Sequence, residues 1–215
     1  MPYRLIPFTN QNFYHIYNRG VEKRKIFSSE RNYQRFLQAL YYYQFSGPKP
    51  RFSTYNRFHL KEFNKNPKIV DIICYCLMPN HFHLLVRQLS KNGIQEFMSK
   101  ILNSYTKYYN TKNKRVGPLF QGTFKAVSID SDEQLLHLSR YIHLNPYVSD
   151  LVKDLSNYYY SSYHEFLDST KQLVCITQPI LDFFPRKDGY KKFINNQQDY
   201  GKTLHQIKDA LIDED

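Results

Sequence analysis

The chain has few cysteines and no long apolar run. Its three cysteines, Cys74, Cys76 and Cys175, form neither an even set for disulfides nor a CxxC metal-binding spacing, which fits a reducing compartment. No apolar run approaches the roughly 20 residues that a membrane helix needs, and the first residues lack a charged region followed by an apolar segment. The sequence therefore argues against disulfide-rich and membrane-spanning proteins, and we expect a cytoplasmic protein.

Acidic residues are scarce and tryptophan is absent. The chain has 19 Asp and Glu against 30 Lys and Arg, a net charge of +11, and 20 Tyr with 16 Phe. Basic side chains bind phosphates with release of counterions, and aromatic rings stack on bases. This composition indicates a polyanionic partner such as nucleic acid, although a merely basic protein would share it.

The length of 215 residues suits one main domain with an appended piece. We place the main domain at residues 1–150 and an extension packed on it at residues 151–215. Residues 44–68 are too long for an ordinary connection and contain several prolines, which indicates a loop or insertion. Basic and aromatic residues alternate there, as on a surface that follows single-stranded nucleic acid; a solvated loop with packed rings would look the same.

The most informative stretch is CYCLMPNHFHLLV at residues 74–86. Alternation along a strand sends His81 and His83 to one face and Phe82 to the other. Two imidazoles on one face, about 7 Å apart by the strand rise, can close on one cation. Partly buried histidines that bond to the backbone are the alternative interpretation. Since Pro79-Asn80 is a turn-forming pair, both histidines open their strand near a rim.

The remaining pattern predicts alternating strands and helices. Aromatic and β-branched residues predict a strand at 12–19, and a helix follows a cap at Ser28 or Ser29. Further strands are expected at 69–78, 81–87 and 124–129, and the clearest helix at 92–110. Tyr105 lies within the apolar stripe of that helix, so we interpret it as a core residue rather than a nucleophile.

A second candidate site lies on a helix at residues 132–145. Ser131 and Gln134 match a capping box, and Pro146 predicts the end of the helix. Tyr141 and Asn145 are one turn apart and share a side of this helix with His137. His137 is either a surface residue or a contact for metal or DNA, whereas His143 should face elsewhere.

These residues together suit metal-assisted phosphoryl transfer to a tyrosine. Only about one tyrosine in a thousand is ionised at pH 7, a deficit of roughly 4 kcal/mol that the site must overcome. A cation held by His81 and His83 would polarise the scissile phosphate and stabilise the departing oxygen. Asn145 offers an oxygen that keeps the metal beside Tyr141.

Three motifs in the same order, PNHFHLLV, GPLFQGTFK and RYIHLNP, resemble those of the REP-associated tyrosine transposases, a branch of the single-tyrosine HUH transposases. The resemblance extends from about Phe13 to Phe166. It implies an α+β fold with a ferredoxin-like βαββαβ core, an antiparallel sheet with helices on one face, plus a catalytic helix and a mixed, mostly helical C-terminal extension. It also implies cleavage and rejoining of single-stranded, hairpin-bearing DNA through a covalent 5′-phosphotyrosine.

Position by position, the resemblance makes His81 and His83 the metal-binding histidines, Tyr141 the catalytic tyrosine and Asn145 the polar metal ligand. The segment commonly written LWQGRFK has Phe120 and Thr123 here, so Lys125 is the candidate for the missing cation. With the basic clusters, this gives the expected nucleic-acid contacts: Arg19, Lys49, Arg51, Arg57, Lys112, Lys114, Arg115, Phe120, Gln121 and Lys125.

Other readings stay open. Phe120 and Thr123, which depart from the family pattern, would suit a domesticated protein that binds structured nucleic acid without cutting it. A hydrolytic metal nuclease is another alternative, and its mechanism would need no tyrosine. Two imidazoles and an amide accept Mn²⁺ as well as Mg²⁺. Related transposases often act as dimers, but the extension after Asp150 could cover that surface, so we favour a monomer.

Overall fold

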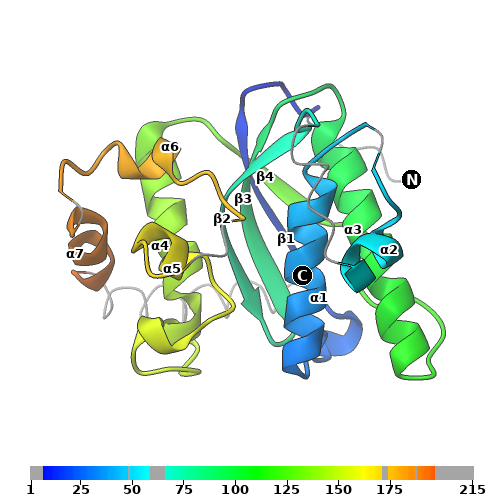
Figure 1. The fold of residues 1–215 in the computed structure, drawn as a ribbon. Coiled ribbons are helices and arrows are strands. Elements are labelled where there is room, and N and C mark those ends of the chain that lie inside the picture. The colour runs from blue at the N-terminus through cyan, green and yellow to red at the C-terminus, as the bar shows by residue number, and fades with distance from the viewer. Residues whose placement is uncertain (1–6, 48, 59–65, 171–173, 187, 197–215) are drawn as a thin grey trace.

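The computed structural model describes residues 7–47, 49–58, 66–170, 174–186 and 188–196. Figure 1 shows a central sheet with α1, α2 and α3 on one side and α4 to α7 on the other. Within these residues, no helix combines the length and the apolar character needed to cross a membrane.

The sheet contains four antiparallel strands. They are β1 (Phe13–Arg19), β2 (Val70–Met78), β3 (His81–Gln88) and β4 (Lys125–Ile129), in the order β2-β3-β1-β4. With α1 after β1 and α3 after β3, the chain order is βαββαβ. The predicted ferredoxin-like α+β core is therefore confirmed.

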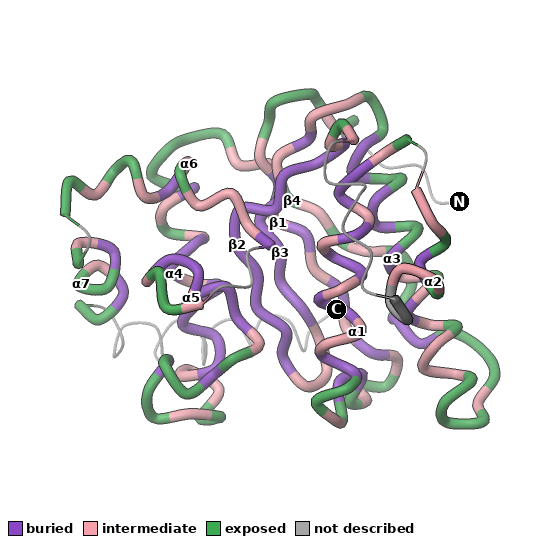
Figure 2. The backbone as a smooth tube through the Cα atoms, in the orientation of Figure 1, coloured by how far each residue is buried: buried purple, intermediate pink, exposed green. Residues whose placement is uncertain are grey.

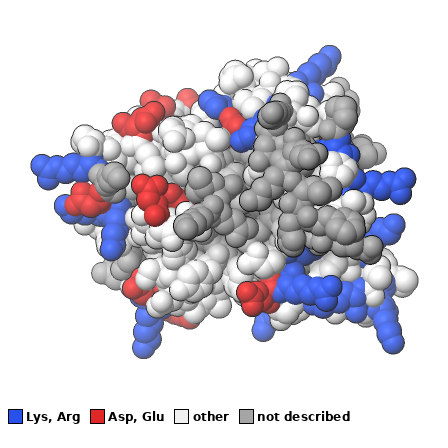
Figure 3. All heavy atoms as spheres, viewed as in Figure 1, with Lys and Arg blue, Asp and Glu red and all other residues white. Residues whose placement is uncertain are grey.

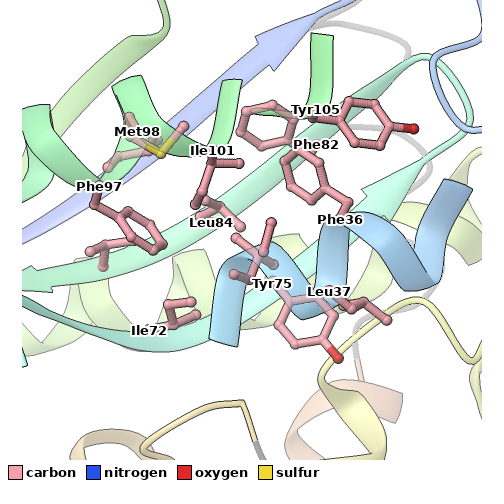
Figure 4. Close-up of a cluster of buried hydrophobic side chains, with 14 of the residues drawn as sticks. Phe36, Leu37, Ile72, Tyr75, Phe82, Leu84, Phe97, Met98, Ile101 and Tyr105 are labelled. Carbon is pink, nitrogen blue, oxygen red and sulfur yellow. The ribbon is translucent and has the colours of Figure 1, made fainter. Parts of the chain in front are cut away.

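Two long helices cover one face of the sheet. They are α1 (Glu30–Tyr43) and α3 (Gly93–Lys112), and a 3₁₀ turn at Val21–Lys23 precedes α1. Figure 4 shows their apolar residues gathered over the strands, and the Phe36 ring of α1 lies 5.2 Å from the Phe82 ring of β3 and 5.1 Å from the Tyr105 ring of α3. The even positions of β1 also face this core. Strand alternation therefore leaves the odd positions of β1, and both histidines of β3, for the other face.

The other face carries α4 (Asp132–Val148), which packs on β2 and β3. Short helical segments of the extension follow: a 3₁₀ turn at Leu155–Asn157, α5 (Tyr163–Phe166), α6 (Gln178–Leu181) and α7 (Gly189–Asn195). They form a second core with α4 and with Cys74 and Cys76 of β2. The described residues of the extension thus carry short helical segments that pack against the tyrosine-bearing helix, whereas residues 171–173, 187 and 197–215 lie outside the described part of the chain.

One local prediction was wrong. Helix α4 continues through Pro146 to Val148, because a proline in the last turn removes only one backbone bond, that to the carbonyl of Ile142.

The segment expected to be a loop or insertion contains one described element. Residues 52–58 form the short helix α2 (Phe52–Phe58). Phe52 is buried against Tyr42 at a ring-centroid distance of 5.0 Å, so an apolar anchor stabilises this turn of helix.

Truncation of a core ring tests the importance of the α1/α3 face. Phe82 has no exposed surface and packs 5.2 Å from Phe36, so Phe82→Ala should lower the free energy of unfolding by about 3–5 kcal/mol. The matched control is Phe183→Ala, because Phe183 is 43% exposed and should cost only about 0.5 kcal/mol. Urea denaturation measures both values, and equal losses would contradict this picture of the core.

Candidate metal and nucleophile site

The site lies on the α4 side of the sheet, where β1 and β3 pair. Arg19 is opposite His81 and Tyr17 is opposite His83 in the antiparallel register. On its other side Tyr17 pairs with Lys125 of β4. Strand alternation gives these side chains one common face. Figure 2 shows β2 buried along its length, whereas β4 is partly exposed, so the β1/β4 part of this face is open to solvent.

The two histidines stand side by side with their rings at right angles. Their centroids are 5.0 Å apart and the ring planes make 87°. His83 is only 6% exposed, and His81 lies half-buried at the first position of β3. Nδ1 of His81 is 2.7 Å from Oδ1 of Asn80, and Nδ1 of His83 is 2.9 Å from Nε2 of His15. Both rings are therefore held by hydrogen bonds.

Helix α4 brings Tyr141 to this pair. The Tyr141 ring lies 5.4 Å from the His83 ring and 6.2 Å from the His15 ring, edge-on in both cases. The helix begins where expected: the hydroxyl of Ser131 accepts the backbone N–H of Gln134 at 3.2 Å. The Gln134 side chain reaches back to the N–H of Asp130 at 2.9 Å. Tyr141 of α4 and His83 of β3, about sixty positions apart in the chain, thus lie next to each other.

Asn145 is buried one turn beyond Tyr141. Its Nδ2 donates to the Tyr141 carbonyl at 2.8 Å, while its Oδ1 is buried without a hydrogen-bond partner. A buried acceptor without a donor costs free energy, and such exceptions in native proteins often mark an ion or a functional role. Imidazole nitrogens and an amide oxygen are donors of the kinds that divalent cations accept. Within the described ranges, no three His, Cys, Asp or Glu side chains gather into a metal site.

Three of the predicted nucleic-acid contacts lie around the histidines. Arg19 ends β1 beside His81, Lys125 opens β4, and the backbone N–H of Gln121 donates to the Arg19 carbonyl at 2.8 Å. Gln121 and Lys125 are exposed. In the view of Figure 3, other Lys and Arg side chains are spread around the rim rather than gathered in one patch.

Other predicted contacts lie away from the histidines. Lys49, Arg51 and the backbone of Arg57 belong to the segment around α2, which contacts α1 on the opposite side of the sheet. Nζ of Lys49 donates to the Tyr42 carbonyl at 2.9 Å, and burial lowers the pKa of Lys49 to about 8. Its ammonium therefore serves the fold in this structure.

The Phe120 prediction needs correction. Phe120 is 6% exposed and packs 6.0 Å from Phe82 and 6.3 Å from Tyr105. Because the Phe120 ring is buried against these two core residues, a nucleic-acid base cannot stack on it. Phe120 is therefore a core residue. The departure from tryptophan at this position is a change of core side chain.

The basic cluster at the end of α3 consists of Lys112, Lys114 and Arg115, and two of these side chains donate hydrogen bonds within the protein. Lys112 donates to the side chains of Ser29 and Asn32 at 3.0 and 2.7 Å. Arg115 donates to the Pro118 carbonyl at 2.7 Å, and Lys114 is exposed. This cluster precedes the loop that leads to Gln121.

The competing candidates have structural roles. Tyr105 is buried and its hydroxyl donates to the Ile26 carbonyl at 2.6 Å, which confirms it as core. His137 is exposed and pairs with Arg140 at 2.6 Å. His143 faces the extension, where it bonds Tyr190 and Ser162 at 2.7 and 2.8 Å. Burial lowers its pKa to about 3, so it is neutral.

Sequence reasoning missed His15 and Asn80. His15 lies in NFYHIYNR, which predicts a strand but carries no signal about the partner strand or its register. Asn80 was interpreted only as a turn residue. The signal in the sequence is that Asn80 directly precedes His81, since turn asparagines commonly form hydrogen bonds to nearby groups through their side chains.

The chain was compared with known proteins. Residues 53–145 match the family model described as transposase IS200 like, a range that includes His81, His83, Tyr141 and Asn145. A solved structure, described as the REP-associated tyrosine transposase bound to a REP hairpin, is 15% identical with a TM-score of 0.52. The similarity covers 82% of this chain and 90% of that one, and at this identity it establishes the shared fold. No curated protein matches the chain.

The cap of α4 should contribute to the stability of the site. Ser131→Ala removes the acceptor for the Gln134 N–H and should cost about 1 kcal/mol of unfolding free energy. Ser131→Asp is the matched control, because a carboxylate caps as well and favours the positive end of the helix dipole. Urea denaturation compares the three proteins. An alanine variant as stable as the aspartate variant would contradict the capping role.

Proposed function

We propose that this chain, which matches the model of the IS200-like transposase family over residues 53–145, is a metal-dependent DNA strand transferase. Its substrate would be single-stranded DNA that bears a hairpin, cleaved and rejoined through a covalent 5′-phosphotyrosine. The observation that carries this proposal is the approach of the Tyr141 ring to 5.4 Å from the His83 ring.

Tyr141 is the proposed nucleophile. Its phenolic oxygen would bond to the scissile phosphorus while the bond to the 3′-oxygen breaks, with the phenol proton lost to solvent and the 3′-oxygen taking one up. The half-exposed ring is compatible with access of a DNA strand from the open side of the sheet. Rejoining reverses these steps with a new 3′-hydroxyl.

His81, His83 and the Oδ1 of Asn145 are the proposed holders of Mg²⁺ or Mn²⁺. The cation would supply Lewis-acid polarisation of the phosphate and stabilisation of charge on the departing oxygen. The buried, unpartnered Oδ1 of Asn145 supports this assignment. Asn145 also ties its own position to the nucleophile through its bond to the Tyr141 carbonyl.

DNA is the proposed partner, and the similar structure is described as bound to a REP hairpin. Arg19, Gln121 and Lys125 surround the histidines and would contact backbone phosphates there, since cationic side chains supply the sequence-independent part of DNA affinity. Helix α4 packs on β2 and β3 of its own chain, which supports a site built by one copy. The extension covers the outer surface of α4, which supports a monomer.

The nucleophile can be tested by trapping the covalent adduct. Incubation with hairpin-bearing single-stranded DNA and Mn²⁺ or Mg²⁺ should give a protein–DNA adduct on denaturing gels, and Tyr141→Phe should abolish it because the attacking oxygen is gone. Tyr159→Phe is the matched control, since Tyr159 is 71% exposed and stacks on His164 in the extension.

The outcomes separate the candidate functions. An undiminished adduct in Tyr141→Phe would refute the nucleophile, and cleavage that survives this substitution would indicate a hydrolytic nuclease. Salt-sensitive binding without any adduct, under either metal, would indicate a domesticated binding protein.

The phosphate contact of Lys125 can be tested by binding at several salt concentrations. Lys125→Ala should weaken DNA binding across sequences and reduce the slope of log affinity against log salt by about 1. Lys100→Ala removes the same charge from α3 on the opposite face of the sheet, where Lys100 pairs with Glu96, and should leave the slope unchanged. Equal slopes for both variants would show that the open face makes no such contact.

A further inference from the structure

His81 and His83 each form a hydrogen bond through the same ring nitrogen, Nδ1. Nδ1 of His81 lies 2.7 Å from Oδ1 of Asn80, and Nδ1 of His83 lies 2.9 Å from Nε2 of His15. An imidazole that binds a metal through one nitrogen commonly donates its other N–H to a neighbouring acceptor, which fixes both the tautomer and the ring orientation. The partners of these two bonds therefore decide which nitrogen is available as a ligand.

The bond to Asn80 sets the tautomer of His81. An amide oxygen only accepts hydrogen bonds, so Nδ1 of His81 carries the proton and the lone pair is on Nε2. A second hydrogen bond supports this orientation of the Asn80 amide, because its Nδ2 donates to the Lys23 carbonyl at 3.4 Å. His81 is thus prepared to bind a cation through Nε2.

The bond between His15 and His83 has two possible directions. If His83 donates from Nδ1, its lone pair is on Nε2, as in His81. If His15 donates from Nε2 instead, Nε2 of His83 carries the proton and cannot bind a cation. Only the first direction gives the two histidines the same ligand atom, and it requires His15 to keep its own proton on Nδ1.

His15 is well placed to hold that bond. It lies on β1, a central strand between β3 and β4, on the same face as His83. Its ring stacks on the His83 ring at 5.1 Å with 21° between the planes, and on Tyr17 at 4.9 Å. A side chain on a rigid strand, with rings on two sides, has little freedom to turn away.

We propose that His15 is a positioning residue, whose Nε2 accepts a hydrogen bond from Nδ1–H of His83 and thereby presents Nε2 of His83 as a cation ligand. The inference rests on the proposed function, since it presupposes a cation at His81 and His83. His15 would therefore not touch the cation itself. It would act through His83, which would bind the cation through Nε2 and donate its Nδ1–H to His15.

The experiment measures Mn²⁺ binding to the full chain without DNA, by electron paramagnetic resonance or calorimetry. His15→Phe keeps an aromatic ring but removes the acceptor, and Mn²⁺ affinity should fall about 10–100-fold, as for other partners of metal-binding histidines. His15→Gln offers an amide oxygen in its place and should restore part of the affinity. Tyr14→Phe is the matched control: it also removes one hydrogen bond from β1, that from the Thr9 N–H at 2.7 Å, but on the other face of the sheet.

A second measurement does not depend on metal affinity. The ¹⁵N shifts of neutral His83 in the metal-free protein should show a protonated Nδ1 and an unprotonated Nε2 in the unsubstituted protein. In metal-free His15→Phe, His83 should shift toward the tautomer protonated at Nε2. A neutral His83 protonated at Nε2 in the unsubstituted, metal-free protein would overturn the inference, whether or not His15→Phe folds.

His83→Ala separates failure of the inference from failure of the proposed function. If His83→Ala binds Mn²⁺ as tightly as the unsubstituted protein, the cation site itself is wrong. If His83→Ala loses Mn²⁺ while a folded His15→Phe binds it normally, only the role of His15 is refuted. Thermal unfolding of each variant without metal establishes that it is folded.

Discussion

The antiparallel pairing of β1 with β3 is the constraint on which the site depends. This register sets Arg19 opposite His81 and Tyr17 opposite His83, and it brings His15 within a hydrogen bond of His83. The same alternation turns Phe82 toward α1 and α3, where its ring is fully buried. A one-residue slip would exchange the two faces, placing histidines in the apolar core and a phenylalanine at the site. The free energy of core packing and the geometry of the site therefore depend on one register.

The second constraint is the position of α4 between the sheet and the extension. Its sheet side carries Tyr141 toward His83, and its far side carries His143 into a network with Tyr190 and Ser162. Ser162 also bonds the backbone of Tyr75 in β2, so the extension is connected to both the helix and the sheet. An extension attached in this way helps to hold α4, and with it Tyr141, the proposed nucleophile, over the histidines of its own chain.

Motifs with a local physical basis were predicted well. The capping box at Ser131, the hairpin turn before His81 and the helical stripe around Tyr105 each depend on residues a few positions apart, and each is present. Predictions that depended on surroundings fared less well. Phe120 was a predicted nucleic-acid contact but is buried beside Phe82, and Lys49 was another but donates to the backbone carbonyl of Tyr42 in α1. Pro146 looked like a helix stop, yet α4 ends at Val148 because the final turn loses only one bond there.

The sequence by itself determined the order of strands and helices in the βαββαβ core, the shared face of His81 and His83, and the shared side of Tyr141 and Asn145, because these follow from the periods of strand and helix. Only the tertiary structure decided that Tyr141 meets His83, that β1 is the neighbour of β3, and that His15 bonds His83. Register and packing arise from contacts between segments far apart in the chain. No local period encodes them, so the orientation of the proposed cation ligands becomes visible only once the sheet is assembled.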